Sequence, residues 1–159
     1  MNYKWSYPPF VPTPPEIIRR MLSTAKVGRE DTVYDLGCGD GRILMSAVKE
    51  FGVKRAVGFE IKKDVYKEAL SRIKGENLLG RISLHNLDFF DADISEATVI
   101  TLYLTGTANE ELKPKLEREC RAGTRIVSRV FNIDGWKSLF TDRTGDIIHL
   151  YHVPYSYNH

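Results

Sequence analysis

Eight consecutive residues limit the folds open to this chain. They read Asp35-Leu36-Gly37-Cys38-Gly39-Asp40-Gly41-Arg42 and join a buried-strand pattern at 32–36 to a helical pattern at 41–51. A sharp strand-to-helix turn needs glycines, because the backbone adopts unusual φ and ψ angles and must approach a ligand with no Cβ in the way. The segment predicts a ligand-binding turn at the carboxyl end of the first strand of an α/β fold.

Short apolar runs and helical patterns alternate along the rest of the chain. Such alternation implies βαβ units and a mostly parallel sheet with helices on both faces, followed here by a C-terminal antiparallel hairpin with its turn near 143–145. We expect strands at 32–36, 55–60, 82–85, 98–104 and 124–131, and a last strand at 146–153.

Four helices are predicted, two of them with well-marked starts. The first has Thr13 as N-cap, Pro14 at the first helical position and Glu16 completing a capping box. Asp64 is expected to cap a helix that runs to about residue 74. Pro114 cannot donate a backbone hydrogen bond, so we place it near the start of a short helix that ends at Gly123, after a turn from Asn109.

The amino-terminal arm is rich in proline and aromatic residues. Five of the seven prolines fall within residues 1–15, where they alternate with Tyr3, Trp5, Tyr7 and Phe10. Such an arm should be extended and stiff. It serves either as a structural clasp packed on the domain or as a lid over a site. We predict one domain over residues 1–159, with the arm at 1–15 and the ligand-binding core at 16–159.

Composition excludes several other classes of protein. With 159 residues there is no room for a second domain. The 23 Lys and Arg against 21 Asp and Glu leave a net charge of +2, too small for a dedicated nucleic-acid binder. Cys38 and Cys120 do not form a disulfide framework or a metal-ligand spacing. No signal peptide or membrane-spanning run is present, so we expect a cytoplasmic protein without a metal or a membrane.

The charges around the turn select the kind of ligand. A dinucleotide-binding fingerprint is not met, because Arg42 stands where its third glycine belongs. Asp35 and Asp40 would repel a pyrophosphate but suit a cation. Glu60 closes the next strand, 25 positions after Asp35. S-adenosylmethionine fits, since its sulfonium and ammonium are cationic and its ribose diol needs a carboxylate such as Glu60.

A third acidic residue follows the third strand. Asp88 is placed to accept a hydrogen bond from the adenine amino group, with Phe89 or Ile61 against the ring face. The alternative is that these acidic residues only cap helices. His149 and His152 are three residues apart on an expected strand, so they point to opposite faces and share no metal.

The chain resembles the class I, seven-strand methyltransferases, whose first motif is E/D-x-G-x-G-x-G and matches residues 35–41. With Phe10-Val11-Pro12-Thr13-Pro14 and residues 33–42 taken together, it is similar to the small archaeal protein-lysine methyltransferases and to the related mitochondrial family. The resemblance implies a Rossmann-like fold with a seven-stranded sheet. It also implies that Pro12, Thr13, Leu36, Gly37 and Gly39 contact the cofactor.

The same resemblance implies an S-adenosylmethionine-dependent protein-lysine N-methyltransferase of broad specificity, whose partners are proteins with exposed lysines. We expect a monomer. We expect Tyr103, Phe10 and Phe131 to form the wall of a narrow channel for the acceptor lysine. A core role for Tyr103 is the alternative. The fourth strand lacks the Asn/Asp-Pro-Pro-aromatic turn that holds the exocyclic amines of bases.

One position departs from the family pattern. An acidic residue is common soon after the serine of the fifth strand, where this chain has Ser128-Arg129-Val130-Phe131. If that position attracts a cationic lysine, Arg129 changes the substrate preference. Methylation of RNA or of a small molecule, and a non-catalytic module that binds S-adenosylmethionine, remain alternative functions.

Overall fold

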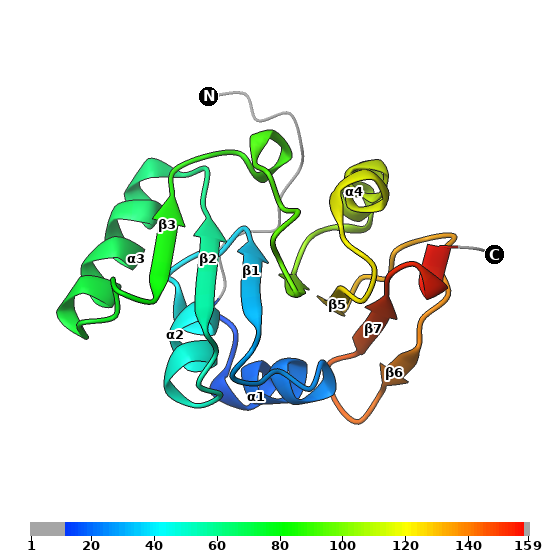
Figure 1. Cartoon of the computed structure of the whole chain (residues 1–159), viewed down its shortest axis with the longest axis horizontal. Coiled ribbons are helices and arrows are strands. Elements are labelled where there is room, and N and C mark those ends of the chain that lie inside the picture. The colour runs from blue at the N-terminus through cyan, green and yellow to red at the C-terminus, as the bar shows by residue number, and fades with distance from the viewer. Residues whose placement is uncertain (1–11, 158–159) are drawn as a thin grey trace.

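The computed structural model of this chain describes residues 12–157. Seven strands form one sheet in the order β3-β2-β1-β4-β5-β7-β6 (Figure 1). Strands β1 to β5 run parallel, and β7 pairs antiparallel with both β5 and β6. The prediction of a mostly parallel sheet with a C-terminal hairpin is therefore confirmed. The strands are β1 (Thr32–Leu36), β2 (Arg55–Phe59), β3 (Ile82–His85), β4 (Val99–Leu102), β5 (Arg125–Arg129), β6 (Phe140–Asp142) and β7 (Ile148–His152).

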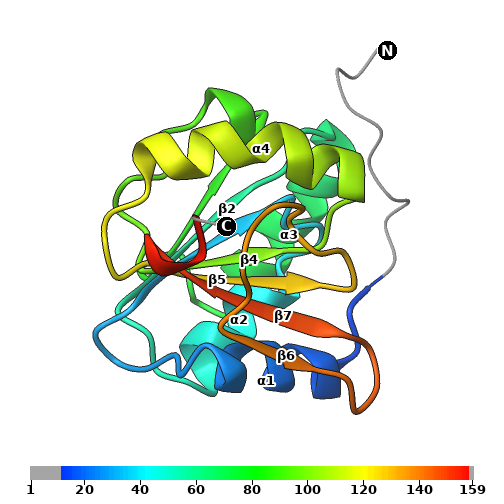
Figure 2. The same ribbon diagram turned by 90° about the vertical axis from the view of Figure 1, so that its right-hand side faces the viewer.

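Helices cover both faces of the sheet, as predicted. They are α1 (Pro15–Thr24), α2 (Arg42–Lys49), α3 (Lys63–Gly75) and α4 (Gly106–Glu119), with 3₁₀ turns η1 (Phe89–Asp91) and η2 (Tyr155–Tyr157). Helices α1, α2 and α3 pack on one face and α4 on the other, which Figure 2 shows with α4 above the sheet and α1 and α2 below it. Within residues 12–157 no helix is long and apolar enough to cross a membrane.

Alternation along each strand divides the core into two layers. In β1, Val33 packs with the layer under α1 and α2, whereas Tyr34 and Leu36 pack with the layer under α4. This is the period of two that a strand buried on both faces requires. The predicted strands therefore lie where the sheet has them, although the predicted ranges 98–104, 124–131 and 146–153 are longer than β4, β5 and β7.

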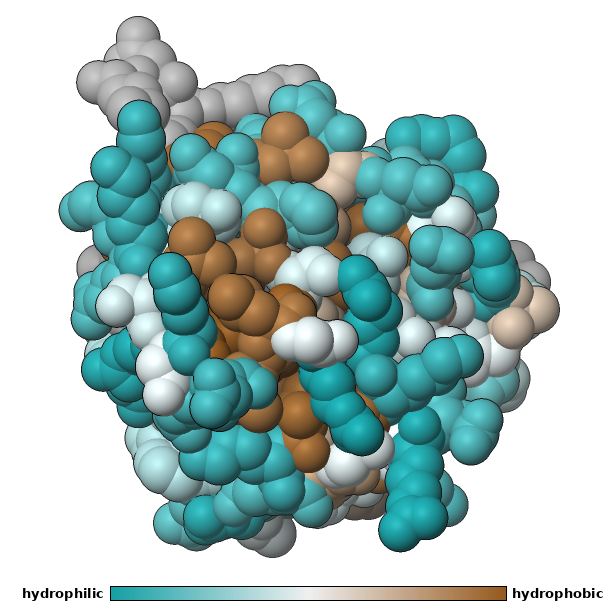
Figure 3. Space-filling model, turned by 60° about the vertical axis from the view of Figure 1, so that its left-hand side comes forward, coloured by the Kyte–Doolittle hydropathy of each residue, from teal (hydrophilic) through white to brown (hydrophobic). Residues whose placement is uncertain are grey.

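The α3 and β3 side of the sheet is less completely covered. Only the short η1 turn lies between β3 and β4 along the chain, in place of a full helix. Figure 3 brings this side forward and shows apolar side chains gathered in a strip between hydrophilic ones. Two of the exposed large apolar residues, Leu79 and Leu87, lie in the loops after α3 and β3.

The predicted position of Pro114 at a helix start is wrong. Helix α4 begins at Gly106, where the Thr105 hydroxyl caps it by accepting a hydrogen bond from the Ala108 N–H (3.1 Å), and Pro114 lies inside it. Proline removes one backbone hydrogen bond from the helix. Burial of Ala108, Leu112 and Leu116 against the sheet outweighs that loss, because packing of an apolar face supplies most helical stability in proteins.

Two predicted helix caps are also wrong. Pro14, not Thr13, is the N-cap of α1, and no side chain caps that helix. The Thr13 hydroxyl instead accepts a hydrogen bond from Arg129 (3.1 Å), a partner 116 residues away. Lys62 is the N-cap of α3, and Asp64 lies in its first turn, where its charge still favours the helix dipole.

Strand β5 ends earlier than predicted, in a tight reversal of the chain. Val130 has a φ of 68°, and the Phe131 N–H donates to the Arg129 carbonyl (2.8 Å), which makes a γ-turn. A positive φ is unfavourable for a β-branched residue. Tertiary hydrogen bonds hold the turn, from the Val130 N–H to the Ile147 carbonyl (2.7 Å) and from Asn109 to the Phe131 carbonyl (3.1 Å).

The glycine turn after β1 needs space as well as conformational freedom. Gly37, Gly39 and Gly41 all have positive φ, at 85°, 56° and 83°. In neighbouring β2, a Cβ on Gly58 would lie 2.5 Å from Leu44 Cδ1 and 2.8 Å from Cys38 Sγ. A glycine in β2 therefore allows the turn to pack directly on that strand.

Replacement of Gly58 by alanine should destabilise the protein by about 1–3 kcal/mol, the usual range for overpacking a core. Gly28→Ala is the matched control, since nothing lies within 4 Å of a Cβ at that position. Chemical denaturation of the two variants checks the expectation. Equal midpoints for both variants would contradict this account of the turn.

Candidate active site

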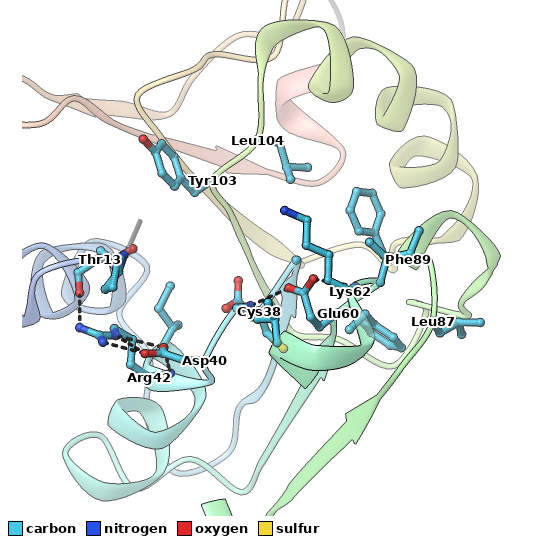
Figure 4. Close-up of a pocket in the computed structure, with 18 of the residues that line it drawn as sticks. Thr13, Cys38, Asp40, Arg42, Glu60, Lys62, Leu87, Phe89, Tyr103 and Leu104 are labelled. Atoms are coloured by element: carbon cyan, nitrogen blue, oxygen red, sulfur yellow. Dashed lines mark hydrogen bonds and ion pairs between the residues drawn. The ribbon is translucent and has the colours of Figure 1, made fainter. Parts of the chain in front are cut away.

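A cleft opens where β1, β2, β3 and β4 end. It encloses about 900 Å³, including solvent at its mouth, and is lined from the carboxyl ends of all four strands (Figure 4). Strands β1 and β4 are neighbours in the sheet although β2 and β3 separate them in sequence. Ligands of open α/β sheets bind at such a switch point.

Most of the predicted site residues meet in this cleft. The predicted residues that line it are Pro12, Thr13, Asp35, Gly37, Gly39, Asp40, Glu60, Ile61, Asp88, Phe89 and Tyr103. Leu36 and Phe131 are not among the lining residues. Leu36 is fully buried in the core layer under α4, and the Phe131 carbonyl accepts hydrogen bonds from Asn109 and Ser128. Phe10 and most of the arm lie outside the described residues.

Sequence reasoning did not assign a site role to several other lining residues. They are Cys38, Arg42, Ile43, Phe59, Lys62, Val65, Leu87 and Leu104. Lys62 follows Glu60 by two residues, and Figure 4 shows its amine directed into the cleft. Its position directly after an acidic strand end was the available signal. Leu104 had no comparable signal, since it reads as the apolar end of a strand.

The Glu60 carboxylate is held by backbone on both sides. Its Oε1 accepts a hydrogen bond from the Gly39 N–H and its Oε2 accepts one from the Lys62 N–H, each 3.0 Å long. The carboxylate thus ties the glycine turn after β1 to the loop after β2. Because only one lone pair of each oxygen is used, the remaining ones can accept from a ribose diol.

Asp35 is a buried carboxyl group with an unusual charge environment. It is 3% exposed, and the Thr101 hydroxyl donates to it (2.8 Å). Burial raises the pKa of Asp35 to about 7, with Glu60 and Asp40 adding to the effect and Thr101 opposing it. The charged groups that act on it are both carboxylates. A cationic ligand would therefore stabilise its ionised form.

Asp40 does not present the unpaired negative charge that the sequence suggested. Two nitrogens of the Arg42 guanidinium donate hydrogen bonds to the Asp40 carboxylate, at 3.0 and 2.7 Å. A nitrogen of Arg72 lies 3.7 Å from the same carboxylate. Burial alone would raise the pKa of Asp40, but the bonds from Arg42 outweigh it and leave that pKa lowered. Asp40 lines the cleft as one half of an ion pair.

Asp88 caps a short helix and also lines the cleft. One oxygen caps η1 by accepting from the Phe90 N–H (3.0 Å), while the residue also lines the cleft beside Phe89. Cys38 lines the cleft too, but burial raises the pKa of its thiol well above the ordinary value. A thiol in that state is a poor nucleophile, so Cys38 is a packing residue.

The cleft fits S-adenosylmethionine by the chemistry of its lining. Within residues 12–157, Asp35, Glu60 and Asp88 form no ion pair with a guanidinium, unlike Asp40, and their acidic groups suit a ligand with an ammonium and a sulfonium. Glu60 and Asp88 close the ends of adjacent strands, where a nucleoside would lie. Phe89 and Ile61 add apolar surface for an adenine ring.

Comparison with protein families decides the classification. The ANTKMT methyltransferase domain matches residues 35–139, a stretch that begins with Asp35 and includes most of the cleft. The chain belongs to the ANTKMT methyltransferase family. The predicted resemblance to class I methyltransferases and the predicted Rossmann-like fold are thereby confirmed.

The proteins and structures that this chain resembles include methyltransferases with different named acceptors. The chain is 55% identical to a protein-lysine N-methyltransferase of Saccharolobus islandicus (strain REY15A), over 80% of each chain. It is 26% identical to the adenine nucleotide translocase lysine N-methyltransferase of Mus musculus, over 81% of this chain and 56% of that protein. An RNA methyltransferase from Salinibacter ruber in complex with S-adenosyl-L-homocysteine superposes with a TM-score of 0.87 at 41% identity, over 91% of this chain and 94% of that one.

The raised pKa of Asp35 predicts how cofactor binding depends on pH. A cation prefers the ionised carboxylate, so binding releases a proton when the pH lies below about 7. We expect the affinity for S-adenosylmethionine to fall by roughly tenfold between pH 7.5 and pH 6, measured by calorimetry. The affinity for methylthioadenosine, which lacks both cationic groups, should change much less over the same pH range.

Asp35→Asn is the control for that pH dependence. The variant should bind the cofactor weakly and with a flat pH profile. Because the folded pKa of Asp35 lies above its ordinary value of 3.8, its contribution to stability is lost as pH rises toward 7. The ligand-free variant should therefore melt at a higher temperature than the wild type at pH 8. An unchanged pH profile would contradict the assignment.

Glu60 gives a second prediction for cofactor binding. Glu60→Ala should weaken binding by about 1.5–3 kcal/mol, roughly ten- to 150-fold, through loss of a charge-assisted hydrogen bond. Glu60→Gln, which keeps one acceptor oxygen, should lose less. Glu30→Ala, an exposed site outside the cleft, is the control. Unchanged affinity of Glu60→Ala in the same titration would remove Glu60 from the cofactor site.

Proposed function

We propose that this protein transfers methyl groups from S-adenosylmethionine to lysine side-chain amines of other proteins. The observation that carries the proposal is the acidic cleft, with Asp35 and Glu60 at the ends of β1 and β2, in a chain 55% identical to a protein-lysine N-methyltransferase. The cleft accounts for the methyl donor, and the similarity to that enzyme supports lysine as the acceptor.

Binding and alignment are the work of this chain's own residues. When bound, S-adenosylmethionine supplies an electrophilic methyl group on a sulfonium. Asp35, Glu60 and Asp88 hold and orient the donor from one side of the cleft, while Tyr103 and Leu104 narrow the other. Alignment at about 3–3.5 Å with exclusion of water can lower a barrier by on the order of 7–11 kcal/mol.

A lysine acceptor must lose its proton before it reacts. Its ordinary pKa is about 10.4. An apolar, aromatic channel beside a positive charge lowers that pKa, because burial and like charge both disfavour the ammonium form. The described residues that line the cleft include no histidine, and this chemistry requires no dedicated base.

We also propose broad acceptor specificity. The cofactor core occupies most of the described chain, which leaves recognition to short loops after β4 and β5 and to the segment before α1. A small recognition surface should accept exposed lysines on many proteins. We further expect the protein to be a monomer in the cytoplasm. Its acceptors should be proteins and not nucleic acid.

Incubation with methyl-labelled S-adenosylmethionine and a cell lysate tests the function. The label should appear on lysines of many proteins, located by mass spectrometry of the lysate and of the enzyme itself. Wild type should exceed Asp35→Asn by at least tenfold. Parallel reactions on total RNA and on the low-mass fraction test the two other acceptor classes.

Each other outcome overturns the proposal in a different way. Label that partitions with RNA would match the name of the Salinibacter ruber neighbour and would exclude the lysine assignment. Label in low-mass products would indicate a small-molecule acceptor. Tight cofactor binding by calorimetry with no labelled product would indicate a binding module.

A further inference from the structure

Arg129 lies behind the wall of the cleft and contacts two of the residues that form it. Its guanidinium stands over the Tyr103 ring, 4.4 Å from the centroid, and its Nη1 donates to the Thr13 hydroxyl (3.1 Å). Thr13 and Tyr103 both line the cleft, whereas Arg129 does not. One side chain thus joins the segment before α1 to the loop after β4.

The positive charge of Arg129 is compensated behind the wall. Its Nε and Nη2 both reach Asp146 Oδ2, at 2.8 and 2.7 Å, in the turn between β6 and β7. Arg129 is only 9% exposed. Asp146 therefore offsets the positive charge that Arg129 places behind Tyr103.

Two features of the fold bring Arg129 to this place. Leu102 of β4 pairs with Ser128 of β5, so the residues that follow, Tyr103 and Arg129, emerge side by side. The γ-turn at Val130 then reverses the chain directly after Arg129. The guanidinium consequently lies beside the carboxyl ends of β4 and β5, over the Tyr103 ring.

The turn that holds Asp146 is itself anchored. Arg20 of α1 reaches the Asp142 carboxylate (2.9 Å) and the Asp146 carbonyl (3.1 Å). Within residues 12–157, Arg20 makes no hydrogen bond or ion pair with Thr13 or Tyr103. The two arginines therefore bind the same turn, and Arg129 also contacts two residues that line the cleft.

We propose that Arg129 is a positioning residue for the methyl acceptor. It fixes Thr13 and Tyr103 relative to each other and so sets the entrance through which the acceptor reaches the cofactor. Figure 4 shows Thr13 and Tyr103 on one side of the cleft and Glu60 and Phe89 on the other. Because Glu60 lies on the far side, and Thr13 is the expected cofactor contact that Arg129 bonds, we expect Arg129 to act more on the acceptor than on the cofactor. This inference rests on the proposed lysine methyltransferase function.

Arg129→Gln tests the proposal. The variant should lose at least tenfold in kcat/KM for a lysine-bearing protein such as a histone or lysozyme, with the loss in kcat. Its dissociation constant for S-adenosyl-L-homocysteine should rise less than threefold. Arg129→Lys, which keeps the charge over Tyr103, should recover part of kcat.

Arg20→Gln is the matched control, because it removes an arginine from the same turn without touching the wall of the cleft. It should keep kcat/KM within twofold of wild type. A double variant, Arg129→Gln with Tyr103→Leu, should lose little more than Tyr103→Leu alone if the arginine acts through the ring. Additive losses, or equal losses for Arg20→Gln and Arg129→Gln, would overturn the proposal.

Hydrogen exchange separates failure of this inference from failure of the proposed function. In Arg129→Gln, amides of residues 13–18 and 103–108 should exchange faster, whereas Arg20→Gln should leave residues 103–108 unchanged. If the wild type methylates no lysine, the proposed function fails, but this measurement still tests whether Arg129 fixes Thr13 and Tyr103. Unchanged exchange at both segments in Arg129→Gln would overturn it.

Discussion

The pairing of β1 with both β2 and β4 is the constraint on which the site depends. Because the chain leaves β1 toward β2 and returns later to β4, the loops after these strands diverge and leave a cleft between them. Asp35, Glu60 and Tyr103 meet only because their strands end at the same edge of one parallel sheet. The Glu60 carboxylate, bonded to the backbone of both the glycine turn and the following loop, then fixes the floor of that cleft.

The buried carboxyl group of Asp35 lowers the stability of the ligand-free protein when it is ionised. Asp40 is compensated by Arg42, whereas Asp35 is buried among other carboxylates and has its pKa raised to about 7. A fold selected for stability alone would pair or remove such a group. Its presence is understandable if a cationic ligand completes the charge balance, as perturbed groups at functional sites commonly require.

The C-terminal hairpin contributes to the site indirectly, through its ion pair with Arg129. In sequence it looks like a simple addition to the sheet edge, yet its turn receives Arg20 from α1 and Arg129 from β5. Through Arg129 it contacts Thr13, which lies before the first helix and 116 residues away in sequence. Arg129 thus joins the start of the described chain to the turn between β6 and β7.

Local patterns located the strands, the glycine turn and the acidic residues after strands β1 and β2, because these depend on periodicity and on the conformational needs of neighbouring residues, but they did not give the end of β5. They failed where a distant contact competed with a local preference. Thr13 was expected to cap α1 but bonds to Arg129, and Pro114 was expected at a helix start but lies inside α4. Packing of α4 on the sheet and the reach of one guanidinium are long-range interactions, and no local pattern carries them. For the same reason the contact of Arg129 with Tyr103 depends on the pairing of β4 with β5, which only the tertiary structure determines.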